Sequence, residues 1–254
     1  MISAYVHPYS NVLNMEVDVR LILPDADGSG RQLPCIYLCH GGSGDEDAWL
    51  LYGGVAELAD QYRAVFCLVN AADSCFTDMA HGFRYASFIG EELPVIMRQL
   101  FKQLSGKREE TFIAGLSNGG YGALLIGLAH PETFAAIGAF SAGDKADAKP
   151  KAFPAGQMDP RIRLFGQTEI HDTNYSITHL AEVLAASDRP KPRIYHACGG
   201  KDPWLDMNHI VRRCFEELAC PEYAYQYHQI EEYGHEWAFW REELVRFLVD
   251  AAGL

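Results

Sequence analysis

Short apolar runs and longer segments with helical spacing alternate along the chain. The segment Asn11–Leu23 alternates apolar and polar residues, which predicts an antiparallel strand or one arm of a hairpin. Apolar runs predict further strands at Pro34–Cys39, Ala64–Asn70, Thr111–Gly115, Phe134–Phe140, Arg193–Cys198 and Glu222–Ile230. Helical spacing predicts helices at Ala48–Tyr62, Ser87–Leu104, Gly119–Ala129, Tyr175–Ser187, Asp206–Leu218 and Trp237–Ala251.

This order of elements predicts an α/β fold. Strands that alternate with helices favour a mostly parallel central sheet with helices on both faces, here with an antiparallel hairpin at the N-terminus. No linker or internal repeat interrupts the alternation, so residues 1–254 are expected to form a single domain. The pattern weakens at about residues 141–173, where three prolines accompany little periodicity. This segment is predicted to be an irregular, lid-like insertion.

Composition and charge exclude several classes of function. Hydrophobic residues make up 48% of the 254 positions and charged residues 22%, which is typical of a globular protein with a large core. The 34 acidic residues outnumber the 21 basic ones, for a formal net charge of −13. Such a field repels phosphates, so neither a nucleic acid nor an anionic membrane is expected as a partner. Homo-oligomer formation is left open.

The location is expected to be cytoplasmic. Residues 1–20 lack the basic segment and apolar run of a secretory signal, and no apolar stretch suits a bilayer. The seven cysteines form no C-x-x-C pair, and several lie in apolar runs. They are expected to be buried free thiols in a reducing compartment.

The strongest chemical signal is the segment Gly115-Leu116-Ser117-Asn118-Gly119, which matches the pattern G-x-S-x-G. An expected strand enters this segment and an expected helix leaves it. Such a sharp turn forces unusual backbone angles on Ser117 and leaves room only for small residues at Gly115 and Gly119. The hydroxyl would then lie at a helix N-terminus, where the helix dipole favours developing negative charge. The pattern predicts a nucleophile; the alternative is a turn that serves only close packing.

A serine hydroxyl needs a base to remove its proton as it attacks. His235 is the candidate, because it lies in a loop between an expected strand and the last helix, directly after Gly234. The alternative is a surface or capping residue. Three of the other histidines lie within expected strands or helices and are interpreted as structural: His196, His209 and His228. A metal site at His196 and Cys198 is not expected.

The base in turn needs a buried carboxylate that holds it in one tautomer. Asp202 follows an expected strand, at the edge where an α/β sheet presents its ligand-binding loops. Asp206 is the rival, but it falls within the next expected helix. The order Ser117, Asp202, His235 along the chain is that of an α/β-hydrolase triad. Asp202 is therefore favoured as the acid, with an N-cap of the following helix as an additional role.

A tetrahedral intermediate also needs hydrogen-bond donors for its oxyanion. The backbone N–H of Asn118 is one candidate, and the loop 40–44 (HGGSG) supplies the other. Gly42 is the preferred donor there and Gly41 the alternative. The loop lacks the spacing of a phosphate-binding or dinucleotide-binding loop. Gly41, Trp49 and Trp204 are expected to contribute to substrate binding, although aromatic residues more often pack in a core.

These motifs resemble those of the esterase D superfamily of α/β-hydrolases, and the chain is similar to bacterial tributyrin esterases. The segments that carry the resemblance are 9–15 (YSNVLNM), 40–44 with Trp49, 77–82 (TDMAHG), 91–94 (EELP), 115–123 (GLSNGGYGA) and 233–237 (YGHEW). The chain departs from the family at Asn118, where methionine is common, and around Asp202.

The resemblance implies a serine carboxylesterase that hydrolyses short-chain acyl esters, including acetyl or feruloyl esters of carbohydrates. No cofactor and no metal is implied, and the expected partner is a small-molecule ester. Two alternatives stay open at this point. One is a thioesterase of the S-formylglutathione type, and the other is a non-catalytic binding protein that keeps the fold.

Overall fold

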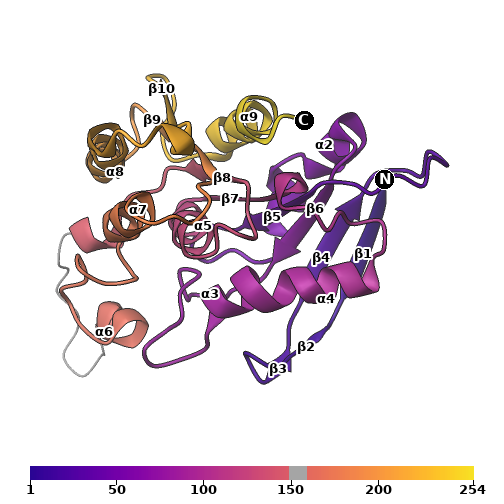
Figure 1. Ribbon diagram of the computed structural model, residues 1–254, viewed down its shortest axis with the longest axis horizontal. Coiled ribbons are helices and arrows are strands. Elements are labelled where there is room, and N and C mark those ends of the chain that lie inside the picture. The colour runs from indigo at the N-terminus through magenta and orange to yellow at the C-terminus, as the bar shows by residue number, and fades with distance from the viewer. Residues whose placement is uncertain (149–158) are drawn as a thin grey trace.

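An eight-stranded sheet forms the centre of the computed structural model, which describes residues 1–148 and 159–254 (Figure 1). The strand order is β1-β4-β6-β5-β7-β8-β9-β10. Six neighbouring strands are parallel: β6 (Val65–Val69), β5 (Cys35–Cys39), β7 (Thr111–Leu116), β8 (Ala136–Phe140), β9 (Arg193–Gly199) and β10 (Gln226–Ile230). At one edge β4 (Val19–Leu23) runs antiparallel to both β6 and β1 (Ile2–Val6). The predicted mostly parallel sheet with an antiparallel N-terminal hairpin is confirmed.

The region expected to be one strand at residues 11–23 is divided. A two-stranded ribbon of β2 (Tyr9–Ser10) and β3 (Met15–Glu16) precedes β4, and a turn joins its two strands. The Glu92 carboxylate accepts hydrogen bonds from the Ser10 hydroxyl and from the Asn11 N–H, at 2.5 and 2.8 Å. The ribbon is therefore fastened to the helical segment that contains Glu92.

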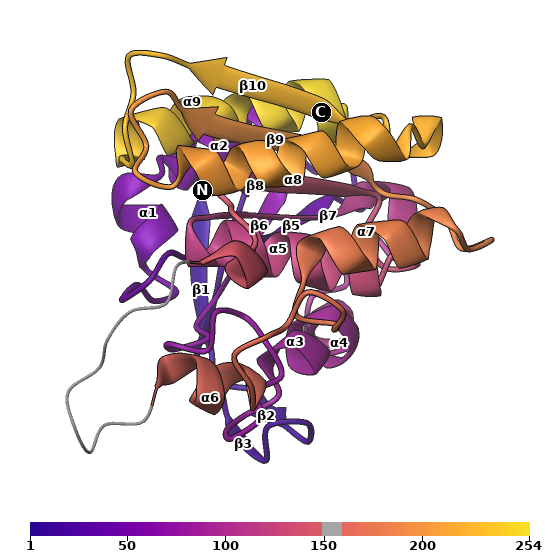
Figure 2. The same cartoon turned by 90° about the vertical axis from the view of Figure 1, so that its left-hand side faces the viewer.

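Helices cover both faces of the sheet, as predicted. One face packs against α1 (Ala48–Tyr52), α2 (Val55–Tyr62) and α9 (Trp237–Phe247). The other packs against α3 (Tyr85–Ser87), α4 (Leu93–Leu100), α5 (Asn118–Ala129), α7 (Ile177–Ala185) and α8 (Leu205–Leu218). Figure 2 shows α7 and α8 in front of the strands and α9 behind them.

The central strands are buried on both sides, which explains their continuous apolar sequence. In β5, Cys35, Tyr37 and Cys39 join the core under α4 and α5, whereas Ile36 and Leu38 join the core under α1, α2 and α9. This two-residue alternation follows from the pleat of a strand.

Two predicted helices are interrupted, each for a local reason. The segment 48–62 divides into α1 and α2 because Gly54 adopts φ 70° between them, a backbone angle that glycine tolerates. The segment 87–104 begins with a π-helical turn, Phe88–Glu92, and ends as α4 at Leu100. Pro94 has no N–H to give to the preceding turn, and the helix changes from π to α geometry at this position.

The expected insertion at about residues 141–173 contains a short helix, α6 (Pro160–Phe165). Leu164, Phe165 and Ile170 form a small apolar cluster that packs against Met79 and Tyr175. Residues 149–158 of the expected lid lie outside the described residues, so the lid stays a prediction. Within the described ranges, no helix combines the length and the apolar character needed to cross a bilayer.

The start of α5 packs in close backbone contact with the end of β5. An added Cβ at Gly119 would lie 2.3 Å from the His40 carbonyl oxygen and 2.4 Å from that of Cys39. We expect Gly119→Ala to lower the free energy of unfolding by about 1–3 kcal/mol, because rigid backbone must move to accept the methyl group. Chemical denaturation followed by circular dichroism measures this change.

Gly106→Ala is the matched control, because nothing lies within 4 Å of an added Cβ there. We expect the control to keep the wild-type free energy of unfolding or to raise it slightly. Equal denaturation midpoints for both variants would contradict the proposed close contact at Gly119.

Candidate active site

Ser117 occupies a strained turn between β7 and α5. Its backbone has φ 54° and ψ −120°, a region that non-glycine residues rarely adopt. The turn is held because the Ser117 N–H donates to the Phe140 carbonyl at 2.8 Å and the Tyr121 N–H donates to the Ser117 carbonyl at 3.0 Å. An added Cβ at Gly115 would lie 2.4 Å from the Gly119 carbonyl oxygen, so this position requires glycine. The half-buried side chain is thereby presented beside the N-terminus of α5.

His235 extends from the loop between β10 and α9 to Ser117. Its Nε2 lies 3.0 Å from the Ser117 Oγ, which is hydrogen-bond distance. Its ring packs against the Trp240 ring in a perpendicular arrangement, with the ring centroids 4.9 Å apart and the planes at 88°. The side chain is 24% exposed, so one part of the ring remains open to solvent.

Asp202 completes a row of three side chains. Its Oδ2 lies 2.7 Å from the His235 Nδ1, and its Oδ1 accepts a hydrogen bond from the Trp204 N–H at 2.8 Å. The carboxyl group is fully buried. Burial alone would raise the pKa of Asp202, but hydrogen bonds from His235, Trp204 and Ser141 outweigh it and hold the pKa below its ordinary value. Asp202 is therefore ionised at neutral pH and favours the His235 tautomer with hydrogen on Nδ1.

The loop that carries Asp202 and the loop that carries His235 are bonded to each other. The Gly200 N–H donates to the Ile230 carbonyl, and the Lys201 N–H donates to the Tyr233 carbonyl, both at 2.9 Å. An added Cβ at Gly199 would lie 2.5 Å from the Tyr233 carbonyl oxygen. The glycines before Asp202, where the chain departs from the esterase D pattern, thus allow this close approach.

The rival residues lie elsewhere or have structural partners. Asp206 is exposed in the first turn of α8. His196 is fully buried between Tyr225 and Asn208, and burial lowers its pKa to about 4. The other two histidines also bond to neighbours outside the Ser117–His235–Asp202 row, His209 to Gln229 and His228 to Glu243.

The loop after β5 lies beside Ser117 and Asn118. His40 Nε2 accepts a hydrogen bond from the Ala71 N–H at 3.2 Å, so the other ring nitrogen, Nδ1, carries the hydrogen and donates to the Gly41 carbonyl at 2.7 Å. The C=O and N–H of a trans peptide point in opposite directions. Because the Gly41 carbonyl turns toward His40, the Gly42 N–H turns away from it. An added Cβ at Gly42 would lie 3.0 Å from Asn118 Nδ2, so this exposed loop lies against the start of α5.

The side chain of Asn118 makes a polar contact beside the nucleophile. Its Oδ1 accepts a hydrogen bond from the Lys145 ammonium at 2.7 Å, and Lys145 also lies over the Tyr121 ring, 5.6 Å from its centroid. A methionine at this position could not make the hydrogen bond. The departure from the family pattern therefore adds a polar group beside the nucleophile.

The two tryptophans expected to bind substrate differ in their surroundings. Trp49 is 1% exposed, donates its indole N–H to the Cys39 carbonyl at 3.0 Å and contacts the Phe140 and Trp237 rings. These are contacts of core packing, so we leave Trp49 out of the proposed substrate site. Trp204 is 42% exposed at the start of α8, next to Asp202.

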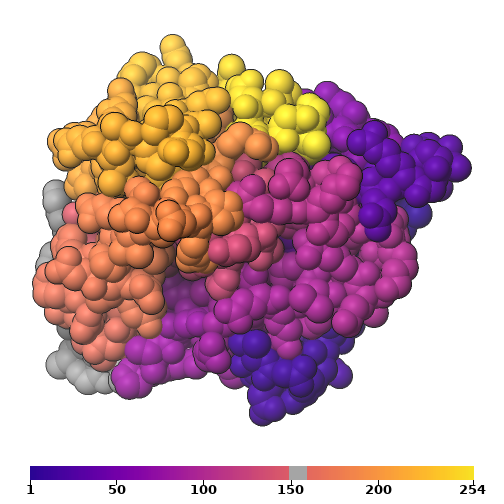
Figure 3. All heavy atoms as spheres, in the orientation of Figure 1, coloured from indigo at the N-terminus to yellow at the C-terminus, as the bar shows by residue number. Residues whose placement is uncertain are grey.

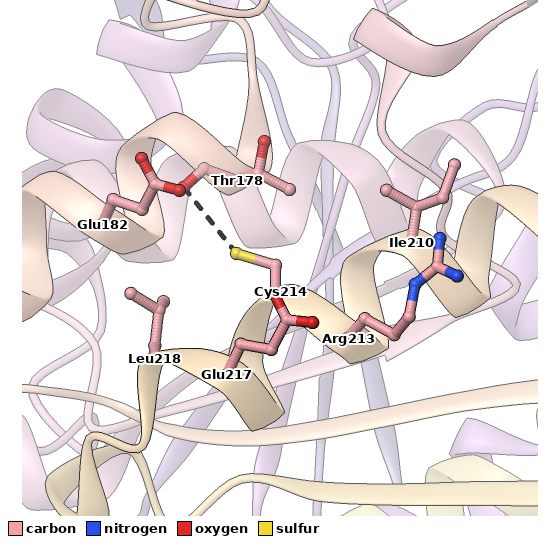
Figure 4. A pocket seen from close by; sticks show the side chains of 7 residues that line it. All are labelled: Thr178, Glu182, Ile210, Arg213, Cys214, Glu217 and Leu218. Atoms are coloured by element: carbon pink, nitrogen blue, oxygen red, sulfur yellow. Dashed lines mark hydrogen bonds between the residues drawn. The ribbon is translucent and has the colours of Figure 1, made fainter.

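Two surface cavities lie apart from this row of side chains. One, of about 400 Å³, lies between α7 and α8, and Figure 4 shows its lining residues: Thr178, Glu182, Ile210, Arg213, Cys214, Glu217 and Leu218. The other, of about 450 Å³, lies between residues 77–87, the C-terminal half of α5 and residues 173–175. Figure 3 shows the surface hollowed between the orange and purple segments of the chain. Neither cavity is lined by Ser117, Asp202 or His235.

Comparisons with known proteins agree with this geometry. The family described as "Putative esterase" matches residues 10–251. An acetyl esterase from Caldicellulosiruptor saccharolyticus is 30% identical over 249 residues, which cover 92% of each chain. The chain belongs to this esterase family. It is therefore a carboxylic ester hydrolase.

Solved structures share the fold of the esterase. The serine hydrolase FphF of Staphylococcus aureus, a fluorophosphonate-binding protein, superposes with a TM-score of 0.86 and 24% identity, covering 99% of this chain and 98% of that one. The S-formylglutathione hydrolase FrmB of Staphylococcus aureus gives a TM-score of 0.82 and 24% identity, with coverage of 99% and 100%. The predicted α/β-hydrolase fold is confirmed.

Sequence reasoning missed two residues of the site, Ser141 and Trp240. Ser141 directly follows β8, and its hydroxyl accepts a hydrogen bond from the Trp240 indole at 3.0 Å and helps to hold the pKa of Asp202 below its ordinary value. The only signal in the sequence was that Ser141 follows a buried strand, as the segments of Ser117 and Asp202 do. Trp240 lies at an ordinary core position of an amphipathic helix.

We expect Asp202→Asn to lower kcat of the esterase by about 10⁴-fold, because an amide favours the wrong His235 tautomer and cannot balance an imidazolium. Asp206→Asn is the matched control and should keep the wild-type kcat. Steady-state hydrolysis of p-nitrophenyl acetate measures both. A large loss in the Asp206 variant with little change in the Asp202 variant would reverse the assignment of the acid.

Proposed function

We propose that the esterase hydrolyses short-chain acyl esters through an acyl-enzyme on Ser117. The observation that carries this proposal is the continuous row of hydrogen bonds from the Ser117 hydroxyl to His235, at 3.0 Å, and from His235 to the buried Asp202, at 2.7 Å. Nucleophile, base and orienting acid are the groups that acyl transfer from an ester to water requires.

In the first half of the reaction Ser117 attacks the ester carbonyl while His235 Nε2 takes the hydroxyl proton. The imidazolium that forms is stabilised by the ionised Asp202. The carbonyl oxygen becomes an oxyanion, and the backbone N–H groups of Gly42 and Asn118 donate to it. His235 then gives its proton to the alcohol oxygen, the bond between this oxygen and the acyl carbon breaks, and the alcohol leaves.

In the second half water attacks the acyl-enzyme. His235 takes a proton from the water as the new bond forms, and the same two N–H groups hold the second oxyanion. The proton returns to Ser117 as the acid product leaves. The half-buried positions of Ser117 and His235 support access of both ester and water.

The acyl group is proposed to be small, with acetyl as the first candidate. The similarity to an acetyl esterase over 92% of both chains supports this choice. An added Cβ at Gly41 would lie 3.7 Å from the Ser117 Cβ, and one at Gly42 would lie 3.0 Å from Asn118 Nδ2, so this loop leaves little room beside the nucleophile. The exposed Trp204 beside Asp202 is proposed to contact the alcohol portion of the ester. Its exposed position leaves room for a carbohydrate as that alcohol.

We further infer that the chain acts as one catalytic domain in the cytoplasm. The two apolar cores pack on opposite faces of a single sheet, which supports one folding unit. The net charge of −13 supports the inference that nucleic acids and anionic membranes are not partners.

The role of Ser117 is tested by substitution and by covalent labelling. We expect Ser117→Ala to lower kcat on the order of 10⁶-fold and to abolish labelling by a fluorophosphonate probe, with an unchanged circular dichroism spectrum. Ser29→Ala, in an exposed loop, is the control and should be labelled like the wild type. Full activity of the Ser117 variant would leave the hydrolysis without its proposed nucleophile, and would favour a binding protein with a contaminating activity.

The acyl preference is tested with a panel of esters. We expect kcat/KM to be highest for p-nitrophenyl acetate and to fall at least tenfold by the octanoate, because a longer chain must pass residues packed around Ser117. Methyl ferulate, acetylated xylo-oligosaccharides and S-formylglutathione complete the panel. A kcat/KM for the thioester that exceeds every oxygen ester would assign the esterase instead to the thioesterase alternative.

A further inference from the structure

We propose that the amide side chain of Asn118, oriented by Lys145, recognises an oxygen atom in the acyl group of the ester. The preferred substrates are short 2-hydroxyacyl or 2-alkoxyacyl esters, in which an oxygen is bonded to the carbon next to the carbonyl. Acyl groups of the same length with a hydrocarbon chain are disfavoured. This inference rests on the proposed function, because it names the class of acyl group that the site around Ser117 selects.

The orientation of the Asn118 amide is determined by its neighbours. An ammonium group can only donate, so the amide atom that lies 2.7 Å from the Lys145 Nζ must be the oxygen. The amide nitrogen therefore lies on the other side of the group, where an added Cβ at Gly42 would lie 3.0 Å from it. Among the described residues this nitrogen has no hydrogen-bond acceptor. Two N–H groups thus remain available beside the loop that is proposed to hold the oxyanion.

Lys145 is held in place from two directions. Its ammonium lies over the Tyr121 ring, 5.6 Å from the centroid, and this ring is fully buried. Lys145 also begins a short turn whose N-cap, Asp144, is fully buried. The Asp144 carboxylate accepts a hydrogen bond at 2.9 Å from the hydroxyl of Ser176, the N-cap residue of α7. The orientation of the Asn118 amide is therefore fixed before a substrate binds.

The proposed mechanism places the acyl chain on the side of this amide. His235 must reach the alcohol oxygen to protonate it, so the alcohol portion lies on the His235 side of the bound ester. The carbonyl oxygen lies between the backbone N–H groups of Gly42 and Asn118. The acyl chain then extends away from His235, beside Gly42 and the Asn118 amide.

The two amide N–H groups make the acyl side of the site selective. A methylene group in this place would cover the N–H groups without replacing their hydrogen bonds to water, which costs free energy. An ether or hydroxyl oxygen in the same place accepts one of these hydrogen bonds. Methionine, which is common at this position in the family, offers no such donor. Asn118 is thus expected to change the acyl preference of this chain and not only its polarity.

The test compares p-nitrophenyl methoxyacetate with p-nitrophenyl butyrate in the full-length enzyme. The two acyl chains have the same number of heavy atoms and differ by one ether oxygen in place of a methylene group. Their difference in intrinsic reactivity cancels when the ratio of the two kcat/KM values is compared between a variant and the wild type. We expect Asn118→Met to lower this ratio by roughly three- to tenfold, which corresponds to the loss of one hydrogen bond between uncharged groups.

Lys145→Met tests the orienting role of the lysine. Without the ammonium the Asn118 amide is free to rotate, so we expect the ratio to fall by about two- to threefold. The double variant should show the ratio of Asn118→Met alone, because Lys145 acts through the amide. Lys107→Met is the matched control, since Lys107 is exposed and pairs with Glu110 at 3.2 Å, and it should keep the wild-type ratio. Circular dichroism checks that each variant is folded.

An unchanged ratio in both Asn118→Met and Lys145→Met would overturn the proposal. This outcome includes an equal loss of kcat/KM for the two esters, which would make the amide a further donor to the oxyanion instead. A ratio in the double variant well below that of Asn118→Met would overturn the orienting role of Lys145. A failure of the proposed function is distinguishable, because Ser117→Ala would then keep its activity on both esters and its fluorophosphonate labelling.

Discussion

A carboxylate removed from water is the group on which the arrangement of this esterase depends. Burying a charge costs several kcal/mol unless hydrogen bonds replace its hydration. Asp202 receives these bonds from the His235 ring and from the backbone at Trp204. The donors come from the loop before α9 and from the start of α8. The surroundings of Asp202 can therefore form only when the carboxyl ends of these strands and their loops are in place. The buried charge thus affects both folding and catalysis.

The parts of the site that follow from short-range rules could be predicted from the sequence. Steric exclusion around Ser117 requires glycine at Gly115 and Gly119, and the added-Cβ distances of 2.4 and 2.3 Å show the reason. The neighbourhood of Asp202 and His235 could also be predicted, because parallel strands bring their carboxyl ends to one edge of a sheet. The hydrogen-bond distances among these side chains agree with that expectation.

Other features depend on tertiary contacts that leave no local trace. Trp49 follows a glycine-rich loop and was expected to contribute to substrate binding, but α1 places it in the core against Phe140 and Trp237. Ser141 and Trp240 meet only because β8 and α9 pack together, so neither sequence neighbourhood indicates a link to Asp202. The interrupted helices had a clearer signal, since Gly54 and Pro94 lie at the breaks. The apolar periodicity nevertheless predicted two continuous helices. This periodicity indicates which face of a segment is buried, and it does not show whether the helical backbone is continuous.

The helix that begins after Ser117 is enclosed almost entirely by protein. In α5 the residues from Gly119 to Leu128 are all buried, with the sheet beneath them and other helices above. A change of side chain anywhere along this stretch alters packing before it alters chemistry. Natural variation in the range of esters accepted by relatives of this fold must therefore accumulate in the surface loops that surround the nucleophile. The helix itself acts as a fixed foundation, and the loops are where new specificities can evolve.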